Sequence, residues 1–393
     1  MHSQQLVVID NPMSNSWLKK LDDTLDIHLK CPDVALDTYR SINRIQLAYS
    51  VLRKRRIYLD TLVWIRLRDV EMGRSTDSTY KALLDVLRDA CGRDQLICPL
   101  SCSAVSELLN QEDRATRLAT ARIMDDLSQA VCIQRFDYLL SSELEHLLCK
   151  TLLPEHTHAV PEDLAWTKVA FFVGQPTLSA DVLSPTQLLA MQKSIDDAML
   201  SVSVETLASR FPSNRRQKFV KKSTLEAIAK LNVEKVKPAH LLDSYQQFVE
   251  SEVWGALEVF EQLLGQTMSR LAQMAGFDGK ITEADRKAGA DMLRRLIGNA
   301  YKFNRISSEV PQLHINSSLH ALVRYDHKRK YKPGDLEDFR HAGAALPYCH
   351  VFLTEKSLAH MLHHPPAAIV DHYSCQVFSD PTEALEHIRA VAA

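Results

Sequence analysis

The chain has 393 residues, of which 46% are hydrophobic and 24% charged, as in an ordinary globular protein with room for two or more domains. A formal net charge of −2 excludes a protein that coats nucleic acid through its overall charge, although it leaves room for local basic patches. With 11 glycines and no Walker or GxGxxG loop, the sequence gives no support to an ATP- or NAD-dependent activity.

The cysteines and the N-terminus indicate the cellular compartment in which the protein is found. The 8 cysteines form no CxxC pair and mostly lie in apolar surroundings such as LICPL, which favours reduced thiols over a disulfide framework or a zinc site. The first residues lack a basic start followed by a long apolar run, so we expect no signal peptide. No stretch of about 18 apolar residues occurs, so we expect no membrane span and no membrane partner. These features predict a cytoplasmic protein.

The first third of the chain begins with helices and then alternates between strands and helices. An amphipathic helix is predicted over 36–52, and the basic run 53–56 leads into a short buried strand over 57–59. Further helices and strands alternate after it, with helices from Thr61, over 78–91, after Ser101 or Ser103 and over 114–128, and strands over 96–100 and 131–133. This alternation predicts an α/β fold with a parallel sheet.

The pattern changes in the middle of the chain. From 137 to about 310 it is nearly all helix-periodic without a convincing strand, which we interpret as a large all-helical insertion. Strands over 351–353 and 376–378 then resume the sheet, and a helix follows from Pro381. The predicted organisation is an N-terminal helical segment 1–52, a core with a first part 53–136 and a second part 311–393, and the insertion 137–310 between them.

Acidic side chains gather in the second part of the core. Asp335 and Asp338 stand three residues apart at the start of a predicted helix, so their carboxylates leave the same face. Pro347 ends that helix, because proline lacks an amide hydrogen and crowds the preceding turn. Glu355 follows the strand over 351–353. This places an acid at the carboxyl edge of a sheet, where open α/β folds bind their ligands.

Two more acids occupy similar places in the first part of the core. Asp60 closes the strand over 57–59, and Glu107 lies on the helix after the strand over 96–100. Four acids at corresponding ends of parallel elements, Asp60, Glu107, Asp338 and Glu355, are expected to converge, with Asp335 as an extra or alternative ligand. Carboxylates without basic partners hold hard cations such as Mg²⁺ or Mn²⁺.

These residues carry a resemblance to the PIN domain, the fold of many prokaryotic metal-dependent ribonucleases. The motifs are YLDT at 58–61, SAVSEL at 103–108, DFRHAGAA at 338–345 and VFLTEK at 351–356. The resemblance covers about 57–135 and 311–393 and implies a PIN-like parallel sheet flanked by helices. It also assigns Asp60, Glu107, Asp338 and Glu355 to catalysis and to the metal ion.

The activity that the resemblance implies is hydrolysis of RNA phosphodiester bonds by an endoribonuclease, such as a bacterial toxin or defence effector. Metal ions polarise a phosphate oxygen and lower the pKa of a bound water, which attacks phosphorus. The chain departs from the family pattern twice. Leu62 replaces a common Asn, and Glu355 replaces the usual Asp, so its carboxylate reaches one methylene farther. Both departures alter metal geometry.

Residues beside the acids are candidates for binding the RNA. Basic runs at 53–56 and 324–332 flank the acidic positions, where they would guide a phosphate backbone. The full set of predicted substrate-binding residues is Arg55, Arg56, Thr61, Lys328, Arg329, Lys330, His341 and Thr354. For His341, one helical turn beyond Asp338, holding a carboxylate in place is the alternative role. The expected partner is RNA or single-stranded DNA, with the insertion as a site for a second copy or a regulator.

Plainer interpretations stay open beside this one. Asp335 and Asp338 are also typical of a helix start, where the helix dipole favours acids, and His341 is also typical of a partly buried core histidine. A scaffold that binds nucleic acid or protein without catalysis is the main alternative, and Leu62 and Glu355 favour it. A metal-dependent phosphatase is a third hypothesis, although Leu62 stands where aspartyl-phosphate enzymes have a second Asp.

Overall fold

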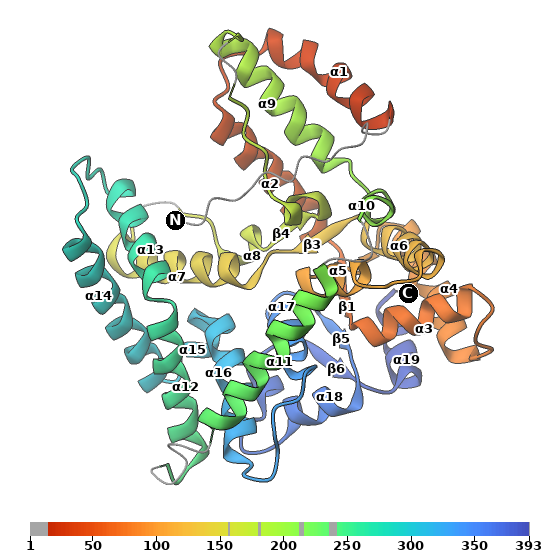
Figure 1. Cartoon of the computed structure of the whole chain (residues 1–393), viewed down its shortest axis with the longest axis vertical. Helices are drawn as coiled ribbons and strands as arrows, with labels where there is room; N and C mark the ends of the chain where they lie inside the picture. Colours follow the sequence, from red (N-terminus) through yellow and green to blue (C-terminus); the bar gives the residue numbers. More distant parts are fainter. Residues whose placement is uncertain (1–14, 156–157, 180–181, 212–215, 236–241, 393) are drawn as a thin grey trace.

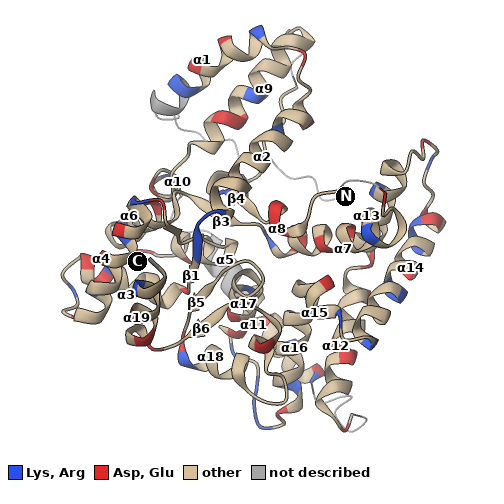
Figure 2. Ribbon diagram, turned by 180° about the vertical axis from the view of Figure 1, so that it is seen from behind, with Lys and Arg blue, Asp and Glu red and all other residues tan. Residues whose placement is uncertain are grey.

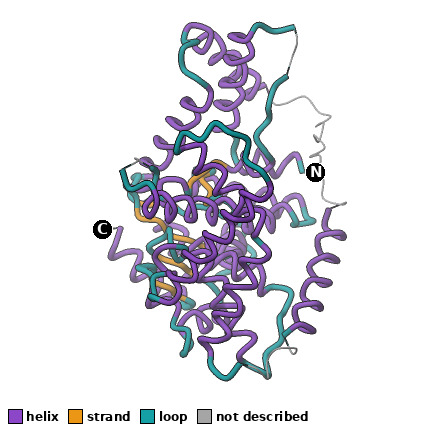
Figure 3. Tube along the Cα trace, turned by 90° about the vertical axis from the view of Figure 1, so that its left-hand side faces the viewer, coloured by secondary structure: helices purple, strands orange, loops and turns teal. Residues whose placement is uncertain are grey.

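The computed structural model describes residues 15–155, 158–179, 182–211, 216–235 and 242–392, and most of them are helical (Figure 1). A sheet of four parallel strands lies among the helices, as the orange segments of Figure 3 show, in the order β2-β1-β5-β6. Its strands are β1 (Arg55–Leu59), β2 (Leu96–Ile97), β5 (Val351–Leu353) and β6 (Gln376–Phe378). The predicted α/β fold class is therefore present, with a smaller sheet than the number of helices suggests.

The sheet is apolar on both faces, as expected for parallel strands covered by helices on either side. In β1, Ile57 and Leu59 pack on one face and Tyr58 on the other, because successive side chains of a strand alternate. Helices that pack against Ile57 and Leu59 are α3 (Thr61–Glu71), α4 (Ser78–Gly92), α6 (Arg114–Ser128) and α19 (Pro381–Ala392). The face of Tyr58 is covered by α7 (Phe136–Leu152), α16 (Pro311–Tyr325), α17 (Asp335–Ala345) and α18 (Lys356–His363).

Local sequence signals set the helix boundaries near the sheet. The side chain of Ser101 accepts a hydrogen bond from the Ala104 amide and so caps α5 (Cys102–Leu109), as predicted. Helices α4, α6 and α19 begin at or within one residue of the predicted positions, and α17 ends at Ala345, before Pro347. Strong caps and prolines make these the positions that sequence specifies best.

The strand over 131–133 corrects the predicted sheet. β3 (Val131–Ile133) pairs antiparallel with β4 (Trp166–Lys168) in a separate two-stranded sheet, and only a single bridge joins Cys132 to Leu100. The expectation that 137–310 holds no strand is therefore wrong at 166–168. Three apolar residues at 131–133 reveal a strand but not its partner, and Trp166–Lys168 holds only one apolar residue, so its sequence gives no strand pattern.

The insertion packs in two groups. One group, with η1 (Val169–Val173), α9 (Pro185–Leu200) and α10 (Val204–Arg210), lies against α6 and the N-terminal helices α1 (Asn15–Lys30) and α2 (Leu36–Leu52). In Figure 1, α1 and α9 project together at one end. The other group packs beside α7 and α16 and comprises α11 (Arg216–Glu234), α12 (Tyr245–Val259), α13 (Glu261–Met274), α14 (Glu283–Lys302) and α15 (Ile306–Glu309).

Two short helices complete the described chain, α8 (Pro161–Leu164) and η3 (Ile369–His372). Across the described ranges, no helix combines the length and the apolar character needed to cross a membrane.

Candidate metal centre

The carboxyl ends of β1 and β5 bring two of the predicted acids to one edge of the sheet. Leu59 is paired with Leu353, and the Asp60 amide donates to the Leu353 carbonyl at 3.0 Å, so the two strands end side by side. Asp60 follows β1 directly, and Glu355 comes two residues after β5. Helices α3 and α18 begin at the next residues, so both acids occupy N-cap positions.

Neither acid caps its own helix. Asp60 is only 5% exposed, yet neither it nor Glu355 makes a side-chain capping hydrogen bond. The hydroxyl of Thr354 donates to Asp60 Oδ2, and no described residue donates to Asp60 Oδ1. An ordinary N-cap role therefore does not explain why a carboxylate is buried at the end of an apolar strand.

Asp338 comes to the same place from the first turn of α17. Its half-buried carboxylate accepts no hydrogen bond and makes no ion pair with the described residues. Burial, followed by the negative charges of Asp60 and Glu355, raises the pKa of Asp338 to about 7. Three acids from three elements therefore repel one another, which is the electrostatic condition that a bound cation relieves.

Glu107 reaches this edge from α5 and is held by two donors. The Thr61 hydroxyl donates to Glu107 Oε2, and His341 Nε2 lies 3.4 Å from the same oxygen. Burial alone would raise the pKa of Glu107, but the hydrogen bonds from His341 and Thr61 and the His341 charge bring it below its usual value. Glu107 is thus held ionised.

A buried chain of hydrogen bonds supports His341 from behind. Its Nδ1 lies 2.6 Å from the Tyr58 hydroxyl, which also lies 2.6 Å from Ser101 Oγ. Burial alone would lower the pKa of His341, but the hydrogen bond to Glu107 and the charges of Asp60, Glu107 and Asp338 raise it. Tyr58 was missed as a site residue, although a tyrosine inside a buried strand needs a hydrogen-bond partner and so signals one.

This series of hydrogen bonds gives a prediction about stability. Tyr58→Phe leaves the buried Nδ1 of His341 without its partner, and we expect a loss of about 1–3 kcal/mol in the free energy of unfolding. Urea denaturation measures it. Tyr80→Phe is the matched control, because the half-buried Tyr80 hydroxyl has no hydrogen-bond partner in the described ranges, and its cost should stay within about 0.5 kcal/mol. Equal losses in both variants would contradict the proposed chain.

The acids do not close on one point in this arrangement. Among the described residues, no group of three His, Cys, Asp or Glu side chains is placed to hold a metal ion. Local partners explain this, since Thr354 holds Asp60, Thr61 holds Glu107, and the Ser357 hydroxyl donates to Glu355.

Asp335 is engaged elsewhere. Its carboxylate accepts from Arg329 at 2.9 Å and from the Lys332 amide at 2.8 Å, and it is 4% exposed. Both oxygens therefore hold the preceding loop in place. We leave Asp335 out of the candidate centre and assign it a structural role.

The predicted substrate contacts of Arg55 and Arg56 need correction. Both residues begin β1, about 13 Å (Arg56) and about 17 Å (Arg55) from Asp60 at about 3.3 Å per strand residue, so they lie at the opposite edge of the sheet. Arg56 is also buried, donating to the Tyr348 and Leu52 carbonyls and to Glu162. Arg55 and Arg56 are close to Asp60 in sequence, but they stand at the opposite end of β1 from it.

This correction is testable. Arg56→Gln removes three hydrogen bonds of a buried guanidinium, and we expect the free energy of unfolding to fall by about 1–3 kcal/mol or more. The exposed neighbour Arg55 serves as the control, and Arg55→Gln should cost less than about 0.5 kcal/mol. Thermal melting of both variants checks this, and a destabilised Arg55→Gln beside an unaffected Arg56→Gln would refute the assignment.

The other predicted substrate residues divide by exposure. His341 is 1% exposed, and Thr61 and Thr354 donate to Glu107 and Asp60, so these three support carboxylates and do not face a substrate. Lys328 and Lys330 are exposed on the loop before α17, whereas Arg329 turns inward to Asp335.

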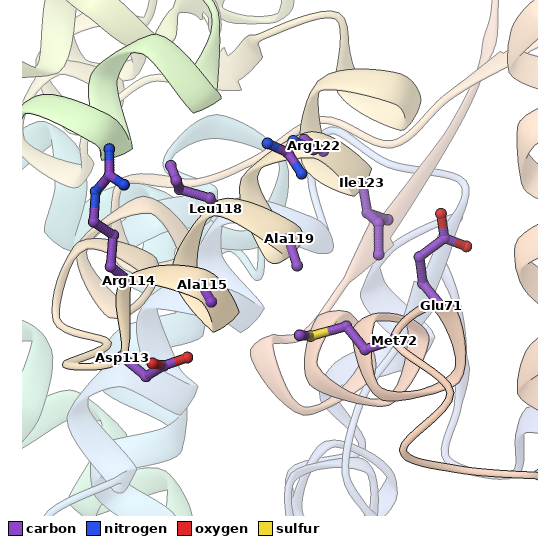
Figure 4. A pocket seen from close by; sticks show the side chains of 9 residues that line it. All are labelled: Glu71, Met72, Asp113, Arg114, Ala115, Leu118, Ala119, Arg122 and Ile123. Atoms are coloured by element: carbon purple, nitrogen blue, oxygen red, sulfur yellow. The ribbon is translucent and has the colours of Figure 1, made fainter.

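Two hollows lie near these elements. The first, of about 770 Å³, lies between the end of α3 and the start of α6 (Figure 4), lined by Glu71, Met72, Arg114 and Arg122 among others. It sits about 15 Å from Asp60, because α3 rises about 1.5 Å per residue between them. The second, of about 720 Å³, runs along α5 and α17 toward α12 and α16, and none of Asp60, Glu107, Asp338 and Glu355 lines it.

Comparison with models of protein families, with characterised proteins and with solved structures found no match to this chain.

Proposed function

We propose that the chain is a PIN-like endoribonuclease, a hydrolase that cuts RNA in the cytoplasm with Mg²⁺ or Mn²⁺. The observation that carries this proposal is the pairing of Asp60 with Asp338. Both carboxylates have oxygens without donors among the described residues, and their charges oppose each other at the carboxyl edge of a parallel sheet. A divalent cation would relieve both conditions at once.

The donor set fits a hard cation. Asp60, Asp338 and Glu355 offer only carboxylate oxygens, the ligand type that Mg²⁺ and Mn²⁺ prefer, and Glu107 adds a fourth acid across from them. When bound, such an ion polarises a phosphate oxygen and lowers the pKa of a coordinated water. Glu355 lies one residue farther from its strand than Asp60 does, and its longer side chain would offset part of that difference.

The remaining side chains fix the orientation of Asp60 and Glu107 and keep Glu107 ionised. Thr354 fixes one oxygen of Asp60 and leaves the other open. His341 and Thr61 keep Glu107 ionised and aim it from α5, while Tyr58 fixes the His341 ring. Such outer partners typically change metal affinity or activity by about 10–100-fold when removed.

The test is cleavage of a panel of RNA and single-stranded DNA by the purified chain in Mn²⁺, Mg²⁺ or EDTA. We expect RNA cutting that requires the metal and a melting temperature that rises with Mn²⁺, since a ligand of the native state stabilises it. No cutting and no metal-dependent rise would overturn the proposal.

A second candidate is a PIN-like module that binds nucleic acid or protein without cutting it. The absence of a ready group of three ligands in the described ranges favours this candidate, as does Leu62, which is 38% exposed beside Asp60 and offers no polar atom. Under this hypothesis the chain binds RNA in EDTA and in Mn²⁺ alike and never cuts it.

A further inference from the structure

The loop between α16 and α17 is unusually well fixed for an exposed basic segment. It carries His327, Lys328, Lys330 and Lys332, all exposed, and Figure 2 shows it as a mostly blue stretch. Basic loops on protein surfaces are ordinarily mobile, because nothing but water meets their charges. Here several hydrogen bonds, most of them partly buried, hold the backbone.

The first set of contacts comes from within the loop. Asp326 Oδ1 accepts from the amides of Lys328 and Arg329, at 2.9 and 3.3 Å, which closes a turn. At the other end, Asp335 holds Arg329 and the Lys332 amide. The loop is thereby tied to the first residue of α17, three positions before Asp338.

The second set comes from the insertion. Asn232 on α11 pairs with both backbone groups of Tyr331, donating to its carbonyl at 3.1 Å and accepting from its amide at 2.9 Å. Lys235, 7% exposed, donates to the carbonyls of Asp326 and Arg329. The end of α11 therefore acts as a clamp on the loop backbone.

Because the clamp fixes the loop backbone, it also fixes which side chains of the loop point inward and which point outward. Arg329 and Tyr331 point inward, Tyr331 being 4% exposed, whereas Lys330 and Lys332 point outward. Lys330 and Lys332 stand two residues apart, at most about 7 Å along the chain, and each ammonium group ends a flexible four-carbon stem, so both can reach phosphates of one strand. Neither lysine makes an ion pair with the described residues.

We propose that this loop, residues 326–332, is a preorganised strap that binds the phosphate backbone of a single-stranded RNA and leads it to the acidic edge. Lys330 and Lys332 contact adjacent phosphates, and Asn232 is a positioning residue that keeps the two ammonium groups in register. The strap rests on the proposed function, because the strand it holds is the strand to be cut. It also gives the insertion a role in substrate binding.

The experiment measures binding of a fluorescein-labelled single-stranded RNA of mixed sequence by fluorescence anisotropy, in EDTA and over a range of salt. Lys330→Gln/Lys332→Gln should weaken binding roughly tenfold and lower the slope of log affinity against log salt by about 1.4, at about 0.7 per phosphate contact. The matched control is Lys280→Gln/Lys287→Gln, the same charge change on the exposed α13–α14 hairpin, with no expected effect.

A separate variant tests the role of Asn232 in the clamp. Asn232→Ala changes no charge and should weaken binding roughly threefold, because the loop must then be ordered when RNA binds. In the Lys330→Gln/Lys332→Gln background it should have no further effect, which a general structural defect would not produce. An additive effect in that background would overturn the positioning role of Asn232.

Two outcomes overturn the strap itself. One is unchanged affinity and salt slope in the strap variant, and the other is an equal loss in the control variant. Failure of the proposed function appears differently, as a wild-type protein that binds RNA through the strap in EDTA but never cuts it in Mn²⁺. Metal-dependent cleavage that is equal in wild type and in the strap variant would refute the strap but support the proposed nuclease activity.

Discussion

Asp60→Asn should lower metal-dependent RNA cleavage by more than about 100-fold. Loss of a residue that only supports a metal ligand already costs up to about 100-fold, and Asp60 is proposed as a ligand itself. Asparagine keeps the shape of the side chain and can still accept from Thr354, so the fold should persist. It removes the negative charge that helps to raise the pKa of Asp338. The melting temperature in EDTA should therefore stay the same or rise, while its increase on adding Mn²⁺ should disappear.

Asp77→Asn is the control for this variant. Asp77 also occupies an N-cap position, but its carboxylate accepts from the amides of Thr79 and Tyr80, so it performs the capping role that Asp60 does not. Asparagine caps as well as aspartate, and both cleavage and metal stabilisation should survive. Wild-type cleavage by Asp60→Asn, with the Mn²⁺ effect intact, would remove Asp60 from the centre.

Glu143→Gln should stabilise the protein strongly at alkaline pH. Glu143 on α7 is fully buried, and it accepts from the Gln312 amide at 3.0 Å and from the Tyr348 hydroxyl at 2.9 Å. Burial raises its pKa from 4.5 to about 8, against the lowering effect of these two hydrogen bonds. A tenfold change in a proton-binding equilibrium corresponds to about 1.4 kcal/mol, so ionising Glu143 inside the fold costs several kcal/mol.

The direction of the pH dependence follows from proton binding. Between about pH 4.5 and 8 the folded protein keeps a proton on Glu143 that the unfolded chain releases, so stability falls as pH rises. The contribution is fully present below the unfolded pKa and is lost as pH passes the folded pKa. Glutamine resembles the protonated carboxyl and should keep that stability throughout.

Thermal melting from about pH 5 to pH 9 measures this effect. Wild type and Glu143→Gln should melt together at the acidic end, and the variant should melt higher at the alkaline end. Glu258→Gln, an exposed change on α12, should follow the wild-type curve. Parallel curves for wild type and Glu143→Gln across the whole range would show that Glu143 does not titrate in the fold.

Sequence patterns predicted the elements of the core well, and for identifiable reasons. Apolar runs closed by Asp60 or Thr354, a capping serine at 101 and a proline at 347 are local signals, so β1, β5, α5 and α17 lie where expected. Patterns could not pair β3 with β4, since three-residue strands carry no periodicity and their partner lies 30 or more residues away. The two-part packing of the insertion depends on tertiary contacts that no local pattern encodes.

The expectation that the acids gather at one edge came from the sequence, as did a carboxylate-holding role for His341, whereas the support given by Tyr58 and Thr354 did not. Strand and helix ends placed Asp60, Asp338 and Glu355, because topology alone brings such ends to one edge. The roles of Tyr58 and Thr61 and the identity of the carboxylate beside His341 needed side-chain geometry, and so did the removal of Asp335 and Arg56. A residue type shows what a side chain can do, whereas its partners decide which of those things it does.

The pairing of β1 with β5 also sets when this site can exist. Asp60 and its hydrogen-bond partner Thr354 are 294 residues apart in the chain. At about 5–20 residues per second, a ribosome needs roughly 15–60 s between making one and the other. For most of that interval the emerging polypeptide lacks both Asp338 and Glu355. If the proposed function holds, a growing chain would lack a complete site and could not cut its own message, and a product released early would stay inactive.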